Sequence, residues 1–189
     1  MMEPHLAFYP DERIALFIDG ANLYSAGKSL DFDIDYNKLL DVFRKRGRLI
    51  RAYYYTAVYE RDDYSALRPL IDFLDYNGYH VVTKSAKEHV DREGRKRIKG
   101  NMDIEMTVDM LSHIGAIDHM VLFSGDGDFC AAVKAVQDKG VRVTVVSTQK
   151  SKPSMLSDDL RRQADNIIEL HDMSDMIGRE KHNPYSVDD

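Results

Sequence analysis

The chain has 189 residues, which is enough for one domain of ordinary size with a hydrophobic core. Hydrophobic residues make up 43% and charged residues 31%, as in a soluble globular protein, and no apolar run reaches the roughly 20 residues of a membrane helix. The first residues lack the basic and apolar segments of a secretion signal, and the single cysteine, Cys130, excludes an internal disulfide. We therefore expect a cytoplasmic protein without membrane contact.

Apolar runs with strand character alternate along the chain with segments of helical periodicity. In chain order, we expect strands at 13–19, 49–58, 79–84, 119–125, 141–147 and 166–170. Between them we expect helices at 36–47, 61–78, 102–115, 128–140 and 153–164. Four of these helices stop at a glycine, which is a common helix end. This alternation with short links predicts an α/β fold with a mainly parallel central sheet.

Two segments lack a clear period. Residues 85–100 are expected to form a long loop or a mobile arm, and residues 171–189 a polar, partly disordered tail. The net charge of −6 argues against a general nucleic-acid coat, yet residues 84–99 contain seven basic and three acidic residues. This basic segment either binds phosphates or is a charged loop that faces solvent.

Four aspartates stand where predicted elements meet. Asp19 ends the first strand, Asp126 and Asp128 follow the strand at 119–125, and Asp103 opens the helix at 102–115. Ligands of open α/β sheets bind outside the carboxyl ends of the strands, so we expect these side chains to converge on one edge. Oxygen ligands without a His or Cys cluster favour Mg²⁺ or Mn²⁺ over Zn²⁺. Taken singly, each aspartate is better explained as a turn residue or a helix cap, whereas the whole set at one predicted edge favours a site.

Two further polar residues accompany this set. Asp109 lies six residues after Asp103, about 9 Å along a helix and in a different direction, so we expect Asp103 to be the direct ligand and Asp109 to support it. Asn22 follows Asp19 in the sequence Asp-Gly-Ala-Asn, where it is either a helix N-cap or a polar residue of the site.

Three segments of the chain resemble the NYN domain, in the LabA-like branch of the PIN-like nuclease superfamily: FIDGANLY (17–24), KGNMDIEMTVDML (99–111) and LFSGDGDFCAAVKAVQDKGVRVTVVS (122–147). They follow one another in the family's order, and the resemblance covers residues 12–170. It implies a three-layer, PIN-like Rossmannoid sandwich that hydrolyses RNA phosphodiester bonds with Mg²⁺ or Mn²⁺. Residues 171–189 would then be a C-terminal tail to this domain.

The resemblance also implies roles for single residues. The metal-binding acids would be Asp19, Asp103, Asp126 and Asp128, with Asn22 and Ser124 as polar residues beside them and Asp109 as the second acid of the helix. One departure is visible, since many relatives place the first helix acid three residues after the Lys of the Lys-Gly motif and this chain has one residue more. The spacing from Asp103 to Asp109 is kept, so we assign the extra residue to the loop.

We predict a metal-dependent ribonuclease that uses Asp19, Asn22, Asp103, Asp126 and Asp128 in catalysis and binds RNA through Arg95, Lys96, Arg97 and Lys99. The alternative is a regulatory module of the same fold that binds RNA without cleaving it. A phosphatase with an aspartyl nucleophile is disfavoured, because it needs Asp-x-Asp after the first strand, where this chain has Asp-Gly-Ala. The sequence leaves a homo-oligomer open.

Aromatic and thiol side chains offer weaker signals. Tyr53, Tyr54, Tyr55 and Tyr59 either stack on RNA bases or, as is more common for strand residues, pack in the core. Cys130 is expected to be a small buried thiol rather than a nucleophile, because no partnering histidine is apparent.

Overall fold

The computed structural model describes residues 8–59, 67–90 and 96–180, with the backbone alone at 59, 87–90 and 96–99. Within these residues the strands form one seven-stranded sheet in the order β4-β3-β2-β1-β5-β6-β7. The strands are β1 (Arg13–Asp19), β2 (Arg48–Tyr59), β3 (His80–Val90), β4 (Lys96–Lys99), β5 (His119–Phe123), β6 (Arg142–Ser147) and β7 (Asn166–Glu169). All neighbours pair in parallel except β3 and β4, which pair antiparallel.

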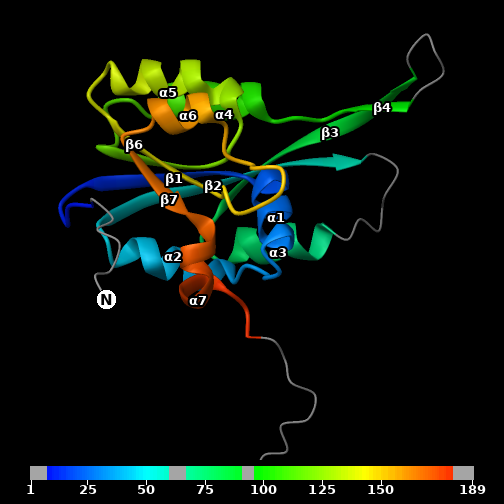
Figure 1. Ribbon diagram of the computed structural model, residues 1–189, viewed down its shortest axis with the longest axis horizontal. Helices are drawn as coiled ribbons and strands as arrows, with labels where there is room; N and C mark the ends of the chain where they lie inside the picture. The colour runs from blue at the N-terminus through cyan, green and yellow to red at the C-terminus, as the bar shows by residue number, and fades with distance from the viewer. Residues whose placement is uncertain (1–7, 60–66, 91–95, 181–189) are drawn as a thin grey trace, which may run out of the picture.

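Helices cover both faces of the sheet (Figure 1). One face carries α1 (Gly20–Ser29), α2 (Tyr36–Arg44), α3 (Arg68–Tyr76) and α7 (Ser174–Ile177), and the other carries α4 (Asp103–Ser112), α5 (Cys130–Gln137) and α6 (Asp158–Gln163). Short 3₁₀ turns, η1 (Gly127–Phe129) and η2 (Leu170–Met173), precede α5 and α7. The predicted three-layer α/β sandwich is confirmed. Among the described residues, every helix falls short of the length and apolarity that crossing a membrane requires.

The sequence of β1 shows why the sheet needs two helical layers. Ile14, Leu16 and Ile18 point into one hydrophobic core, while Ala15 and Phe17 point into the other, and all five are fully buried. Successive side chains of a strand face opposite sides of a sheet, so an unbroken apolar run is typical of a strand that is covered on both faces. This central strand therefore joins the two cores.

Two helices were not predicted, α1 and the four-residue α7. The sequence of α1 contains two glycines and two serines, which lower helix propensity and blur its apolar period. Its buried residues Leu23, Ala26 and Gly27 nevertheless form one face against the core. The helix predicted at 61–78 is found as α3, whose first described residue is Arg68, and residues 61–66 lie outside the described part of the chain.

The expectation of a long loop at 85–100 is wrong. The strand β3 continues to Val90, and its end pairs antiparallel with β4, so that Lys87 lies opposite Lys99 and Val90 opposite Lys96. The two strands form a hairpin that projects from the sheet beyond the helical layers (Figure 1). Such a projecting ribbon is stabilised by main-chain hydrogen bonds and does not need the alternating apolar residues that mark a strand over a core.

The tail was expected to begin at residue 171, but the folded structure extends further. Residues 171–177 form the end of η2 and α7, and the side chains of Met173 and Ile177 are buried in the core beside α2. The carbonyl of Ile177 also accepts a hydrogen bond from the main-chain N–H of Asp35 at 2.7 Å. Residues 181–189 lie outside the described chain.

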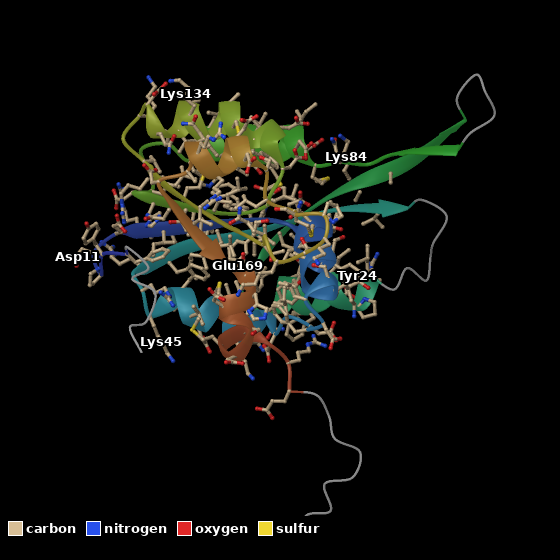
Figure 2. The ribbon with its side chains drawn as sticks, viewed as in Figure 1. Asp11, Tyr24, Lys45, Lys84, Lys134 and Glu169 are labelled. Carbon is tan, nitrogen blue, oxygen red and sulfur yellow. The ribbon has the colours of Figure 1, made fainter. Side chains whose placement is uncertain are left out.

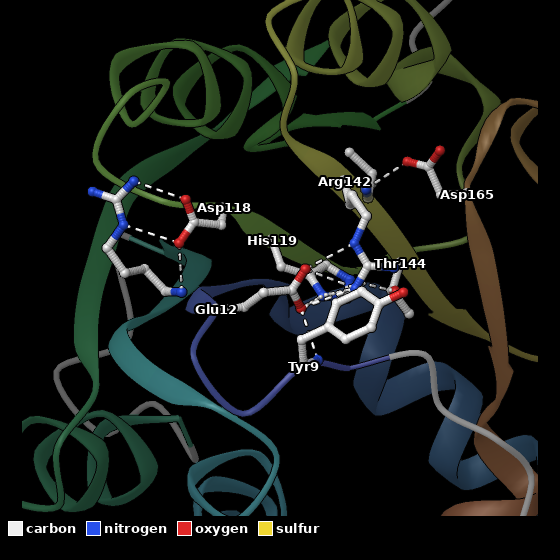
Figure 3. A network of polar contacts seen from close by, with 9 residues as sticks. Tyr9, Glu12, Asp118, His119, Arg142, Thr144 and Asp165 are labelled. Atoms are coloured by element: carbon white, nitrogen blue, oxygen red, sulfur yellow. Dashed lines mark hydrogen bonds and ion pairs between the residues drawn. The ribbon is translucent and has the colours of Figure 1, made fainter.

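A buried polar network crosslinks the amino ends of β1, β5 and β6 (Figure 3). The carboxylate of Glu12 accepts hydrogen bonds from Arg142 at 2.8 and 2.9 Å and lies 3.0 Å from Nδ1 of His119. Nε2 of the fully buried His119 lies 2.7 Å from the hydroxyl of Thr144, and the ring of Phe8 stacks on the imidazole at 4.4 Å. Burial lowers the pKa of His119 below its usual value of 6.5, although Glu12 opposes this shift.

The pKa of His119 predicts how the stability of the fold depends on pH. An unfolded histidine binds a proton below about pH 6.5, whereas the buried His119 resists protonation. The stabilisation that neutral His119 gives to the folded state is therefore fully present above pH 7, and it decreases as the pH falls. In His119→Gln this titration is absent. We expect the stability difference between the parent and the variant, measured by chemical denaturation, to be largest at about pH 8 and to shrink toward pH 5. A difference that does not change with pH would contradict a neutral His119.

Candidate active site

Asp19 lies at the carboxyl edge of the sheet, where the first strand ends. Asp19 is the last residue of β1 and the N-cap of α1, and its carboxylate accepts the main-chain N–H of Asn22 at 3.2 Å. The next residue, Gly20, packs directly against the ring of Tyr54, where a Cβ would lie 2.6 Å from the ring. Glycine therefore lets the chain turn from strand to helix without moving the aspartate away from the sheet.

The loop after β5 lies beside this turn and is bound to it. The hydroxyl of the fully buried Ser124 lies 3.5 Å from the carboxylate of Asp19 and accepts the main-chain N–H of Asp126 at 3.2 Å. The side-chain carbonyl of Asn22 accepts the N–H of Gly125 at 3.3 Å. Asn22 is thus not the N-cap of α1. It and Ser124 link the two loops that carry the aspartates.

Three carboxylates meet next to this link. Asp126 caps η1 by accepting the N–H of Asp128 at 2.9 Å, and Asp103 is the first residue of α4. One carboxylate oxygen from each of Asp103, Asp126 and Asp128 lies within 4.8 Å of the other two. Asp103 also accepts a hydrogen bond from the side-chain amide of Asn101 at 2.7 Å. Residues from two distant parts of the sequence are therefore gathered at one edge, as the positions of the strand and helix ends predict.

A cavity of about 790 Å³ opens over this edge. Asp19, Asn22, Asp103 and Asp126 line one part of it, and the exposed Asp128 lies at its margin, within the carboxylate group. The remaining wall is mostly apolar and comes from β2, α1, α3 and the loops that precede α4 and α6. The structure thus brings all five predicted catalytic residues to one place.

The carboxylates oppose one another electrostatically. Burial raises the pKa of Asp103 to about 6, and repulsion by Asp126, Asp19 and Asp128 adds to this effect. Burial likewise raises the pKa of Asp19, with a further contribution from Asp126, while the hydrogen bond from the Asn22 N–H acts against it. A divalent cation among these oxygens would remove the repulsion, and an all-oxygen set is the kind that Mg²⁺ and Mn²⁺ prefer.

Asp109 occupies a different position from the other acids. It lies on α4 and accepts a hydrogen bond of 2.8 Å from the hydroxyl of Tyr55, a fully buried residue of β2 that borders the cavity. The side chain therefore holds a wall of the cavity in place rather than joining the group around Asp103. Its supporting role remains a prediction.

Three of the four predicted RNA-binding residues lie on the projecting hairpin. Lys96, Arg97 and Lys99 belong to β4, while Arg95 lies outside the described residues. At the root of the hairpin, Lys84 of β3 forms an ion pair of 2.8 Å with Glu105 of α4 (Figure 2). This contact ties the hairpin to the helix that carries Asp103.

The tyrosines of β2 mostly pack in the core or against neighbouring side chains. Tyr54 and Tyr55 are buried, and the hydroxyl of Tyr53 lies 2.7 Å from Nε2 of His113, so packing explains all three. The side chain of Tyr59 lies outside the described structure. Tyr24 of α1, which lines the cavity and is 60% exposed, was not among the predicted site residues. Tyr24 lies two residues after Asn22, on the exposed side of the first turns of α1. This position indicates a site residue only when the start of α1 is known.

Cys130 lies half-buried at the start of α5. Burial raises the pKa of its thiol, and the nearby Asp159 and Asp126 raise it further. The thiol is therefore protonated at neutral pH, which agrees with the expected packing role and not with a nucleophile.

Comparisons with known proteins point to one family. The sequence profile of the NYN domain matches residues 13–172. The Low amplitude and bright protein LabA of Synechococcus elongatus is 36% identical over 185 residues, which are 95% of each chain. An uncharacterized protein of Methanocaldococcus jannaschii is 25% identical over 85% of this chain and 56% of its own length. A protein of unknown function from Vibrio parahaemolyticus has the same fold, with a TM-score of 0.73 and 24% identity over 94% of this chain and 99% of its own.

The crowding of the carboxylates predicts a stability effect in the absence of metal. A carboxyl group whose folded pKa is raised to about 6 lowers stability above that pH, and the effect disappears as the pH falls toward the unfolded value of about 3.9. In EDTA at pH 8, Asp103→Asn should therefore raise the melting temperature, by roughly 2–4 °C for each kcal/mol gained. The gain should shrink toward pH 4.

The matched control is Asp75→Asn, which changes an exposed carboxylate on α3, away from the cavity. It should leave the melting temperature almost unchanged at both pH values. A lower melting temperature for Asp103→Asn at pH 8 would show that the Asp103 carboxylate is not crowded.

Proposed function

The chain belongs to the NYN domain family, and from this premise we propose that it is a metal-dependent ribonuclease. The observation that carries the proposal is the group of Asp103, Asp126 and Asp128 beside Asp19, at the edge of the cavity. Most of the wall opposite these acids is apolar, so the cavity offers both a place for a cation and a surface for an organic substrate.

The distances within the carboxylate group suit a hard cation. Mg²⁺ and Ca²⁺ hold oxygen ligands at about 2.0–2.6 Å, so oxygens of one coordination shell lie within about 5 Å of one another. The 4.8 Å limit for Asp103, Asp126 and Asp128 agrees with this requirement before any side chain moves. We propose these three residues as ligands for Mg²⁺ or Mn²⁺, with Asp19 as the fourth acid.

In the proposed reaction a water oxygen bonds to phosphorus, the ester P–O bond breaks, and the leaving oxygen takes up a proton. A bound Mg²⁺ would lower the pKa of a coordinated water and offset the negative charge of the phosphate. Asn22 and Ser124 would act as positioning residues, because their hydrogen bonds hold Asp19 and the Asp126 loop at a fixed separation. The apolar wall would limit the access of bulk water to the phosphate.

A second candidate is a module that binds RNA without cleaving it. The observation that favours it is the projecting hairpin of β3 and β4, whose basic sequence needs no metal to attract phosphates. The single cysteine agrees with the reducing cytoplasm that we propose as the setting for either function.

Replacing one acid separates the two candidates. Asp126→Asn keeps the size of the side chain but removes a charge from the cation site, so RNA cleavage in Mg²⁺ should fall by about 100-fold or more. RNA binding in EDTA should change little, because no cation then holds a phosphate at the acids and the proposed phosphate contacts of the hairpin remain. Cleavage is measured on a mixed pool of labelled RNA, with Asp75→Asn as the control. If the parent cleaves no RNA in Mg²⁺ or Mn²⁺, the binding module becomes the better explanation.

The proposed role of the hairpin can be tested with an unusually close control. Residues 95–97 and 44–46 are both Arg-Lys-Arg, but the second triplet lies at the end of α2, near the amino edge of the sheet. Reversing Arg95, Lys96 and Arg97 to Glu should weaken RNA binding and flatten its salt dependence by roughly two units of slope, since each phosphate contact contributes about 0.7. The same reversal at 44–46 should have a much smaller effect. Equal effects of the two reversals would assign the result to net charge alone.

A further inference from the structure

A second cavity lies beside the first and is not explained by cation binding or by hydrolysis. It has a volume of about 460 Å³ and lies between α1, α3, residues 32–36 and the segment that follows α7. Its wall is largely apolar and aromatic, with Leu23, Phe32 and Phe73 among its residues, and Arg179 lies at one side. This volume falls within the usual range of about 300–1,000 Å³ for sites that bind small organic groups.

The two cavities are neighbours. Tyr24 and Leu70 line both of them, so the two cavities adjoin at these residues, and we call the pair of cavities the groove. Asp19 caps α1 and Tyr24 lies five residues further on, which is about 7.5 Å along the helix axis. The groove therefore starts at the carboxylates and runs along α1 over a distance that a short stretch of extended RNA can span.

Tyr24 stands at the boundary with its ring accessible. Its side chain is 60% exposed, although large aromatic residues are usually buried (Figure 2). The ammonium of Lys28 lies 5.6 Å from the ring centroid, and the same ammonium forms an ion pair of 2.8 Å with Asp33. Lys28 thus limits the movement of the ring, so an exposed and partly fixed aromatic surface faces the groove.

The second cavity is lined by one acidic and one basic side chain: the carboxylate of Asp33, which forms an ion pair with Lys28, and the guanidinium of Arg179. Arg179 is exposed at the second cavity, and its main-chain N–H donates to the carbonyl of Asp33 at 2.8 Å, which anchors the segment that carries the guanidinium. Single-stranded nucleic acids are bound by this combination of aromatic platforms for the bases and positive charges for the backbone. A purely apolar ligand would leave the guanidinium without a function.

We propose that this groove binds the RNA strand on one side of the scissile phosphate, with one base stacked on Tyr24 and lodged in the second cavity. The inference rests on the proposed function, because it assigns the phosphate of the same strand to the carboxylate site. Tyr24 then sets the position of the strand relative to the acids. Arg179 binds the backbone of the nucleotide whose base fills the second cavity.

The first test measures the affinity for a short, fluorescently labelled oligoribonucleotide in Ca²⁺ by anisotropy. Loss of a stacked base weakens binding by about fivefold to a hundredfold, so Tyr24→Ala should fall in this range, while Tyr24→Phe should stay within about twofold of the parent. The control is Tyr76→Ala, which removes a tyrosine that is 89% exposed on α3 and lines neither cavity. Unchanged binding by Tyr24→Ala, or equal losses for the Phe and Ala variants, would overturn the proposal.

The second test locates the strand directly. An oligoribonucleotide with 4-thiouridine, crosslinked by ultraviolet light, should attach to the tryptic peptide of residues 14–28, at or next to Tyr24. Crosslinks found only on the hairpin peptides would overturn the proposal. The outcome is independent of cleavage: a parent that cleaves no RNA but crosslinks at Tyr24 contradicts the ribonuclease alone, whereas normal cleavage without this crosslink contradicts the groove alone.

Discussion

The parallel pairing of β1 with β5 is the constraint on which the rest of the structure depends. From these two central strands the sheet is extended in opposite directions, by β2 and β3 on one side and by β6 and β7 on the other. The chain must therefore leave both strands at the same edge and turn away in two directions, which opens a space between the loops. The hydrogen bonds of Ser124 and Asn22 join the two loops across this space and fix the distance between them.

The same constraint creates a conflict between folding and chemistry. Bringing Asp103 and Asp126 together next to the partly buried Asp19 raises the free energy of the folded protein, as the raised pKa values of Asp19 and Asp103 indicate. The surrounding structure tolerates this conflict because two cores, one on each face of the sheet, hold the strands that carry the acids. Natural sites that bind cations or substrates often reduce stability in this way.

Most of the candidate site could be predicted from the sequence, because the ends of parallel strands share one edge of the sheet. Asp19 and Asp126 follow apolar runs that are easy to recognise, and parallel pairing then brings them to one edge. The contact of Asp109 with Tyr55 could not be predicted, since the two residues are 54 positions apart and the contact depends on how α4 packs on β2. Tyr24 was missed because its exposure depends on how α1 packs and not on its neighbours in sequence.

The strand β4 is also an edge of the sheet, and this position makes a separate demand on its sequence. An edge strand exposes main-chain groups that can pair with another molecule and lead to aggregation, and charged side chains are a common protection. A charge of either sign gives that protection, so solubility alone would accept Glu as readily as Lys in β4. The sequence Lys-Arg-Ile-Lys contains only positive charges, in a protein whose net charge is −6. Protection of the edge requires charge but no particular sign. The uniformly positive charge of β4 therefore needs another explanation, and it points to a negatively charged partner.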